Sequence, residues 1–268
     1  MAAGRPADIL PKRFQFRGDM RRRVYVAATF VAALAAGRTP YDRATSCFAP
    51  DGTLHQVDYA RAAAGRGSLA VVLSNMDAAV ICVARDSDVA EPLRLDDPSS
   101  SKVFFVDDRV AVVFSGLAAD GRVLANRARL ECQRHRLMAG APASVSHVAA
   151  HVAGLMHECT RTGARRLFGV ECLVVGFEPD TRTAALERRR AWVPRLFHTD
   201  PSGSLNEWTA GAIGARAGEA RELLESAADG LGEMGLDEIA ALASRIVSDS
   251  SDDRTVPVIT LIDAKTKR

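Results

Sequence analysis

The sequence lacks the features that mark several large classes of protein. Its formal net charge is only +2, so there is no excess of one sign to favour nucleic acid or an anionic membrane as a partner. The five cysteines are an odd number without a CxxC pair, so neither a zinc site nor a disulfide framework is predicted. We expect reduced, mostly buried thiols, as in a cytosolic or nuclear protein, at Cys47, Cys82, Cys132, Cys159 and Cys172.

The first 40 residues differ from the rest of the chain. Arg21-Arg22-Arg23 precedes an apolar run, Val24–Ala36, in the manner of a signal peptide, and Ala33-Leu34-Ala35 resembles a cleavage site. The run is shorter than the roughly 20 residues that a membrane-spanning helix needs. We expect residues 1–40 to be a disordered or partly helical extension or an error in the gene prediction, with a targeting segment as the alternative. Residues 41–268 are expected to form one domain.

Apolar runs alternate with amphipathic stretches from residue 69 onward. Strands are predicted at Leu69–Leu73, Ala78–Ala84, Lys102–Val106, Val110–Ser115, Val170–Phe177, Arg195–His198, Trp208–Ile213 and Val256–Ile262. Helices are predicted at Ala118–Met138, from a Ser144 N-cap to Gly163, at Gly218–Ala228 and at Leu236–Ser248. This order predicts an α+β fold, a four-layer α-β-β-α sandwich of two mostly antiparallel sheets. Glu178–Val193 is predicted to be a hairpin insertion.

The stretch from Tyr41 to Ser68 combines several independent signals. Pro50-Asp51-Gly52 has the composition of a turn. A short amphipathic helix follows, because apolar residues recur every three to four positions from Leu54 to Ala64. Gly65 and Gly67 then end the helix before the first strand.

This order resembles the N-terminal signature of proteasome alpha-type subunits, YDR followed by F-S-P-[DE]-G-x-L-x-Q-V-E-Y-A. The departures are mild, Ala49 for Ser and Asp58 for Glu. Lys102–Asp108, Ser115–Arg122 and Thr199–Gly203 also match family motifs, so the resemblance covers nearly all of the chain from Tyr41 onward. Residues 126–137 are most similar to the alpha subunit numbered four in eukaryotic rings. The resemblance implies the N-terminal-nucleophile hydrolase fold.

The resemblance also allows a test for catalysis. In the family's catalytic beta-type subunits, a freed N-terminal Thr is the nucleophile, and a Lys and an Asp support it. The corresponding positions here are Ser68 and Lys102, while the acidic position falls on Ala84 or Arg85. Ser68 is internal, and its release would remove the helix that carries the alpha signature. We expect a non-catalytic subunit, with an active hydrolase cleaved before Ser68 as the alternative.

Two binding functions are implied by the family. The first is a pocket for the C-terminal tails of activator proteins, formed by Lys102, Gly116 and Leu117. The second is a gate cluster that holds the pore open, formed by Tyr41, Asp42, Pro50 and Tyr59. The subunit is expected to sit in a seven-membered alpha ring stacked on beta-type subunits, in ubiquitin-dependent and ATP-independent protein degradation, in cytoplasm and nucleus. No cofactor, nucleic acid or membrane is expected. A free-standing scaffold outside any mixed ring is the remaining alternative.

Three histidines share one predicted helix, His147, His151 and His157. The first two have the i, i+4 spacing that can hold a metal. No Glu lies between them in HExxH fashion, and their apolar neighbours belong to a core-facing stripe. We therefore expect surface or helix-packing histidines and no metal site.

Overall fold

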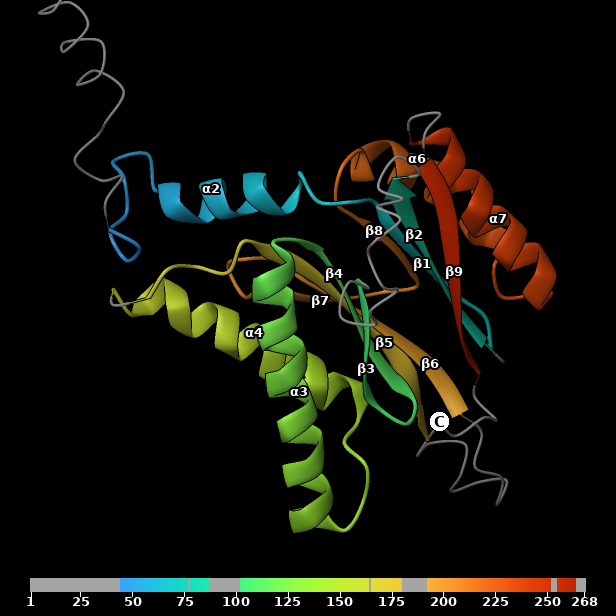
Figure 1. Ribbon diagram of the computed structural model, residues 1–268, viewed down its shortest axis with the longest axis horizontal. Helices are drawn as coiled ribbons and strands as arrows, with labels where there is room; N and C mark the ends of the chain where they lie inside the picture. The colour runs from blue at the N-terminus through green and yellow to red at the C-terminus, as the bar shows by residue number, and fades with distance from the viewer. Residues whose placement is uncertain are drawn as a thin grey trace, which may run out of the picture. The chain divides into compact units, whose positions relative to one another are not determined.

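The computed structural model describes residues 44–76, 78–86, 102–163, 165–179, 192–251 and 255–263. Two sheets of antiparallel neighbours lie in the middle of this part (Figure 1). The four-stranded sheet has the order β8-β1-β2-β9, and the five-stranded sheet has the order β3-β4-β5-β6-β7. The strands are β1 Ala70–Ser74, β2 Ala78–Asp86, β3 Val103–Asp107, β4 Val110–Gly116, β5 Val170–Pro179, β6 Trp192–Thr199, β7 Leu205–Trp208, β8 Ala210–Ile213 and β9 Thr255–Asp263. The predictions for residues 1–40 lie outside the described residues.

Helices cover the outer face of each sheet. Helices α3 (Ala118–Ala139) and α4 (Val145–Arg161) bury their apolar stripes against the five-stranded sheet. Helices α6 (Ala217–Ala227) and α7 (Leu236–Asp249) do the same on the four-stranded sheet, and a short 3-10 turn, η4 (Ala228–Gly230), lies between them. A third apolar cluster fills the space between the sheets. The predicted four-layer α+β sandwich is therefore confirmed.

Helix boundaries follow the local chemistry of the chain. The Ser144 hydroxyl accepts a hydrogen bond from the His147 N–H at 3.1 Å, which confirms the predicted N-cap of α4. Gly140 ends α3 in the left-handed region, at φ 66°, where a side chain would be strained. Helix α2 (His55–Ala64) begins after Leu54 and is followed by Gly65, as the sequence predicts.

The buried cysteines have the character expected of structural thiols. Of the five, only Cys47 is exposed. Burial raises the pKa of the thiols of Cys82 to about 11 and of Cys132 and Cys172 to about 12. These groups therefore stay protonated and unreactive near neutral pH.

One prediction about strands is wrong, and another has different bounds. Trp208–Ile213 is not one strand, because β7 pairs with β6 in one sheet and β8 pairs with β1 in the other. The chain crosses between the layers at Thr209, and no proline or turn motif between Trp208 and Ile213 marks the crossing. The expected insertion Glu178–Val193 is also shorter, since β5 and β6 continue their pairing to Pro179 and Trp192. Residues 180–191 lie outside the described part.

Gly121 lets α3 pack directly on the ring of Phe114. A Cβ at this position would lie 2.3 Å from the ring, and Phe114 is itself fully buried. We predict that Gly121→Ala lowers the free energy of unfolding by about 1–3 kcal/mol, measured by urea denaturation. Gly154→Ala on α4 is the control, because a Cβ there meets nothing within 4 Å, and it should stabilise the protein by up to ~1 kcal/mol. Equal effects of the two substitutions would contradict the close packing.

Candidate docking site at the end of strand β4

The segment after α2 is fixed to the end of β4 by a buried hydroxyl. The Ser115 Oγ lies 3.3 Å from the Ala64 carbonyl oxygen and 3.0 Å from the Ser68 carbonyl oxygen, and it acts as donor. A Cβ on Gly67 would lie only 2.1 Å from the Gly116 nitrogen. Two backbone segments therefore approach as closely as glycine alone permits.

Gly116 is also crowded from its other side. Its φ is 112°, and a Cβ would lie 2.2 Å from the Gly169 carbonyl oxygen. That same oxygen accepts a hydrogen bond from the Leu117 N–H at 3.0 Å. The Lys102 ammonium donates to the Gly116 carbonyl at 3.2 Å. Lys102, Gly116 and Leu117, which the resemblance assigned to one pocket, are thus neighbours in the structure, and we call them the candidate docking site.

Lys102 carries the charge of the candidate docking site. It stands immediately before β3, and its ammonium lies 5.6 Å from the centroid of the Phe114 ring. Burial lowers the pKa of this ammonium below its ordinary value. An ammonium has three N–H groups, so donors remain for an anionic ligand after the bond to Gly116. Leu117, 48% exposed, adds an apolar contact beside it.

A buried carboxylate that sequence reasoning gave no role positions this site. Asp120 accepts hydrogen bonds from Arg166 at 2.7 and 2.8 Å and from the Gly169 N–H at 3.0 Å. Burial raises the pKa of Asp120, but the bonds from Arg166 and Gly169 and the positive charge outweigh it, so that pKa is lowered overall. Asp120 therefore fixes the backbone of Gly169 through its N–H, and the carbonyl oxygen of Gly169 in turn accepts the hydrogen bond from the Leu117 N–H. The aspartate of the S-G-L-x-A-D motif was the available signal.

Only half of the predicted gate cluster lies in the described residues. Tyr41 and Asp42 are outside them. Pro50 belongs to a turn closed by the bond from the Gly52 N–H to the Ala49 carbonyl at 2.8 Å. Tyr59 is exposed on α2, and its ring stacks on that of His55 with centroids 6.4 Å apart. The association of the four residues stays a prediction.

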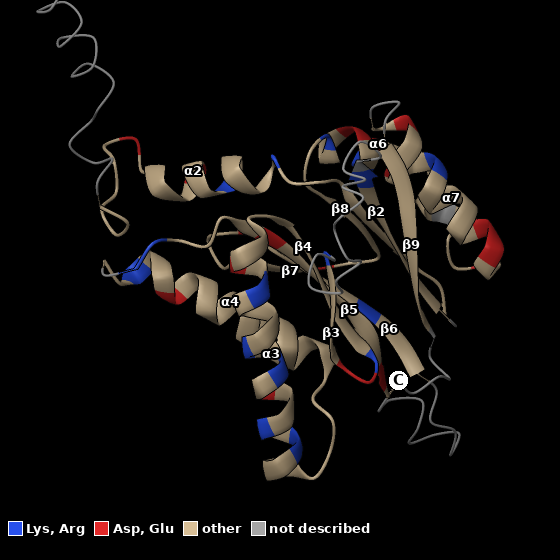
Figure 2. Cartoon of the chain, in the orientation of Figure 1, with Lys and Arg blue, Asp and Glu red and all other residues tan. Residues whose placement is uncertain are grey.

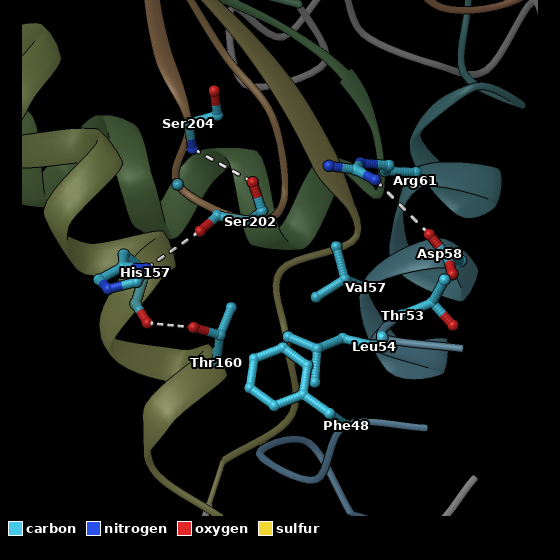
Figure 3. A pocket seen from close by; sticks show the side chains of 12 residues that line it. Phe48, Thr53, Leu54, Val57, Asp58, Arg61, His157, Thr160, Ser202 and Ser204 are labelled. Carbon is cyan, nitrogen blue, oxygen red and sulfur yellow. Dashed lines mark hydrogen bonds and ion pairs between the residues drawn. The ribbon is translucent and has the colours of Figure 1, made fainter. Parts of the chain in front are cut away.

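A cavity of about 560 Å³ lies between α2, the end of α4 and the turn at residues 200–204 (Figure 3). Phe48, Val57, His157 and Thr160 are among the side chains that line it. Near it, the Arg61 guanidinium binds the Asp200 carboxylate at 2.8 Å and so joins α2 to the turn. The sequence indicated the turn but not this ion pair, since the two residues are 139 positions apart.

The structure does not favour catalysis at Ser68. The carbonyl of Ser68 accepts a hydrogen bond from the Ser115 hydroxyl, and neither candidate for the acidic position, Ala84 or Arg85, carries a carboxylate. His147 and His151 do not form a metal site within the described residues, because no group of three or more His, Cys, Asp or Glu side chains there is arranged to hold an ion. Of the helices that the structure describes, none is long and apolar enough to span a membrane.

Comparison with known families agrees with this geometry. A family model described as "Proteasome subunit" matches residues 66–257, and a second model, for the N-terminal signature of the A-type proteasome subunits, matches residues 41–63. The chain is a proteasome alpha-type subunit. It is 40% identical to the proteasome alpha type-7-A subunit of Arabidopsis thaliana over 69% of each chain. It is 41% identical to the alpha type-7-like subunit of Macaca fascicularis and 40% identical to the alpha type-8 subunit of Mus musculus, over 69% of this chain and 68% of each relative.

Membership of this family settles the broad role of the chain. Alpha-type subunits are non-catalytic structural members of the alpha ring of the 20S core, and they assemble with other proteasome subunits in protein degradation. The alternative of an active hydrolase cleaved before Ser68 is therefore not favoured. The predicted non-catalytic role in the alpha ring is confirmed.

The hydrogen bonds that Asp120 accepts from Arg166 and Gly169, which we call the Asp120 clamp, predict how this side chain contributes to stability. Asp120→Asn should lower the free energy of unfolding by about 1–3 kcal/mol, because a charged acceptor of three hydrogen bonds is lost. The folded pKa of Asp120 is depressed, so its contribution is present above the unfolded pKa of about 3.9 and is lost as pH falls through the folded value. Urea denaturation at pH 7 and pH 3 should show a smaller pH dependence in the variant. Asp108→Asn, at an exposed carboxylate, is the control, and an equal change there would contradict the clamp.

Proposed function

We propose that this alpha-type chain captures the C-terminal tail of an activator protein at Lys102, Gly116 and Leu117. The observation that carries the proposal is the Lys102 ammonium, held 3.2 Å from the Gly116 carbonyl at the end of β4. Its position is fixed before any ligand arrives, so little ordering is needed on binding. A terminal carboxylate would pair with the ammonium, and Gly116, without a side chain, would let the tail approach the backbone.

The surroundings of Lys102 favour an anion over other ligands. The ammonium is partly desolvated, so a carboxylate beside it interacts more strongly than it would in bulk water. The exposed Leu117 side chain offers an apolar surface for the residue that precedes the carboxylate. The hydrogen bond from the Gly169 N–H to Asp120 and that from the Leu117 N–H to the Gly169 carbonyl keep Leu117 close to the ammonium.

Replacement of Lys102 tests the docking proposal. In particles that contain Lys102→Met, photo-crosslinking of a synthetic activator tail to this chain should need about ten- to a hundredfold more peptide, because an ionic hydrogen bond of about 1.5–3 kcal/mol is lost. A tail with an amidated C-terminus should crosslink weakly to wild type and variant alike. In the wild type, crosslinking should fall as pH rises through the lowered pKa of Lys102, at a lower pH than for an ordinary lysine. Unchanged crosslinking by Lys102→Met would refute the proposal.

The same chain is proposed to help open the pore through Tyr41, Asp42, Pro50 and Tyr59. What supports this is the match to the family signature and the exposed position of Tyr59 on α2, close in sequence to the turn of Pro50. A tyrosine hydroxyl that bonds a carboxylate in one state of a tail biases the equilibrium between open and closed forms.

The gate proposal predicts an effect that is confined to the activated particle. Tyr59→Phe removes one hydroxyl while keeping the ring, and it should lower activator-stimulated peptide hydrolysis roughly two- to tenfold, as expected for about 0.5–1.5 kcal/mol. The basal rate of the closed particle should stay unchanged and serves as the control. If the variant were stimulated as fully as the wild type, the Tyr59 hydroxyl would have no part in opening the pore.

The family resemblance also supports a proposal about the position of the chain in the particle. We propose a seven-membered alpha ring with six related neighbours, stacked on beta-type subunits in the cytoplasm and nucleus. Residues 126–137 favour the ring position numbered four. Crosslinking of purified particles, with identification of the two chains adjacent to this one, tests that position.

A further inference from the structure

A small polar pocket lies where the segment after α2 meets the start of α6 and the end of α7. Its volume is about 200 Å³, and none of the described residues that line it is Asp or Glu. Figure 2 shows basic residues on the segment that follows α2 and on α6. We call this cavity the arginine pocket; two arginines and four hydroxyl-bearing residues are among those that line it, namely Arg66, Arg216, Ser68, Ser250, Ser251 and Thr255.

The size of the arginine pocket limits what it can hold. Pockets for cofactors and other drug-sized ligands usually have volumes of roughly 300–1,000 Å³. A cavity of about 200 Å³ is smaller than these, so it suits a group of a few heavy atoms. Its lining of guanidinium and hydroxyl groups favours a group that accepts hydrogen bonds.

The two sides of the arginine pocket are joined by the backbone. The Ala215 N–H donates a hydrogen bond to the Gly67 carbonyl at 2.8 Å. A Cβ on Gly214 would lie only 2.5 Å from the Ser68 carbonyl oxygen, so the two segments are in close contact. The backbones that carry the two arginines are therefore fixed relative to each other before a ligand arrives, and this lowers the ordering cost of binding.

One hydroxyl of the arginine pocket is buried without a partner. Ser250 is only 2% exposed, and its Oγ has no hydrogen-bond partner within the described residues. The backbone of this serine is held at the end of α7, because its N–H donates to the Ile246 carbonyl at 3.0 Å. A buried hydroxyl without an acceptor costs free energy. A ligand with several acceptor oxygens would remove that cost.

The full charges of the arginine pocket are positive. Arg216 stands immediately before α6, and the start of a helix adds a partial charge of about +0.5. The end of α7 at Ser250 adds a partial charge of about −0.5, so the two helix ends roughly cancel. The guanidinium groups of Arg66 and Arg216 therefore decide the sign. Both arginines are exposed, so an anion reaches them from solvent.

A phosphate group matches these donors better than a carboxylate does. A guanidinium binds two phosphate oxygens at once, and serine hydroxyls donate to the remaining oxygens. A phosphate monoester carries close to two negative charges at pH 7.5, whereas a carboxylate carries one. Two arginines and a buried hydroxyl thus provide donors for three oxygens, and a carboxylate has only two.

We propose that the arginine pocket binds a phosphate-type oxyanion, held by the guanidinium groups of Arg66 and Arg216 and by the Ser250 hydroxyl. Inorganic phosphate and a phosphorylated side chain of a partner protein share this chemistry, and the test below distinguishes them. The inference is independent of the docking and gate proposals, because neither the candidate docking site nor the gate cluster shares a residue with the pocket.

Hydrogen exchange in particles that contain this chain tests the arginine pocket. The probe is sodium phosphate at pH 7.5, titrated against sodium chloride at constant ionic strength. Peptides from residues 65–70 and 245–251 should exchange at least about threefold more slowly at saturating phosphate, because binding suppresses local opening. In the double variant Arg66→Gln, Arg216→Gln, the midpoint of this protection should rise at least about tenfold, since charge-assisted hydrogen bonds are lost.

A matched variant controls for the loss of an arginine. Arg161→Gln removes an exposed arginine at the end of α4, which does not line the pocket, and it should leave the midpoint unchanged. The absence of protection by phosphate in the wild type would overturn the proposal. Equal midpoints in the wild type and the double variant would overturn it as well.

Ser250→Ala separates binding from folding. In chloride, the Tm of the variant particle should not fall, because the hydroxyl that is removed has no partner. Its midpoint for phosphate should nevertheless rise about three- to tenfold, as expected for one lost hydrogen bond. An unchanged midpoint would contradict the role of Ser250 as a donor to the ligand.

A second titration identifies the source of the phosphate group. The probe is the blocked tripeptide glycyl-phosphoseryl-glycine amide, with the unphosphorylated tripeptide as its control. A lower midpoint than that of inorganic phosphate would assign the ligand to a phosphorylated protein, and a higher one would assign it to the free ion. In either case the midpoint should rise in the arginine double variant. Equal protection by the unphosphorylated tripeptide would contradict recognition of the phosphate group.

Discussion

The close approach of three backbone segments at Gly116 is the constraint on which the proposed docking site depends. Gly67 lies against the Gly116 nitrogen, and Gly116 lies against the Gly169 carbonyl, with no room for a Cβ at either contact. These contacts place the end of α2, the end of β4 and the start of β5 in one fixed arrangement. Ser115 and Asp120 maintain it from opposite sides, through a buried hydroxyl and a buried carboxylate. A side chain at Gly116 would clash with the Gly169 carbonyl oxygen and with the Ala64 Cα.

In this non-catalytic chain with an N-terminal-nucleophile fold, the same arrangement gives Ser68 and Lys102 structural contacts. Ser68 and Lys102, which the resemblance aligned with a nucleophile and its lysine, each have a structural partner. The Ser68 carbonyl accepts the bond from Ser115, and the Lys102 ammonium is directed to the Gly116 carbonyl. The helix α2 that precedes Ser68 is packed on the domain through Val57, Ala60 and Leu167.

The sequence predicted the elements better than it predicted their mutual placement. The ends of α3 and α4 were predictable because Gly140 and Ser144 carry local backbone chemistry. The crossing at Thr209 was not, since β7 and β8 differ only in the distant strand with which each pairs. The Asp120–Arg166 pair joins residues 46 positions apart, and no local pattern encodes it. Lys102 and Gly116 were assigned to one site from the family motif. That assignment did not depend on the bonds from Arg166 and Gly169 to Asp120, which only the structure shows.

The most direct measurement is intact mass and N-terminal sequencing of the chain purified from its own cells, with identification of the chains that purify with it. The account predicts a polypeptide that retains Tyr41–Gly67, and therefore α2, together with alpha-type and beta-type partners. A mature chain that begins at Ser68 would contradict the account, because α2 would be gone and the serine would have the free amine of a catalytic nucleophile.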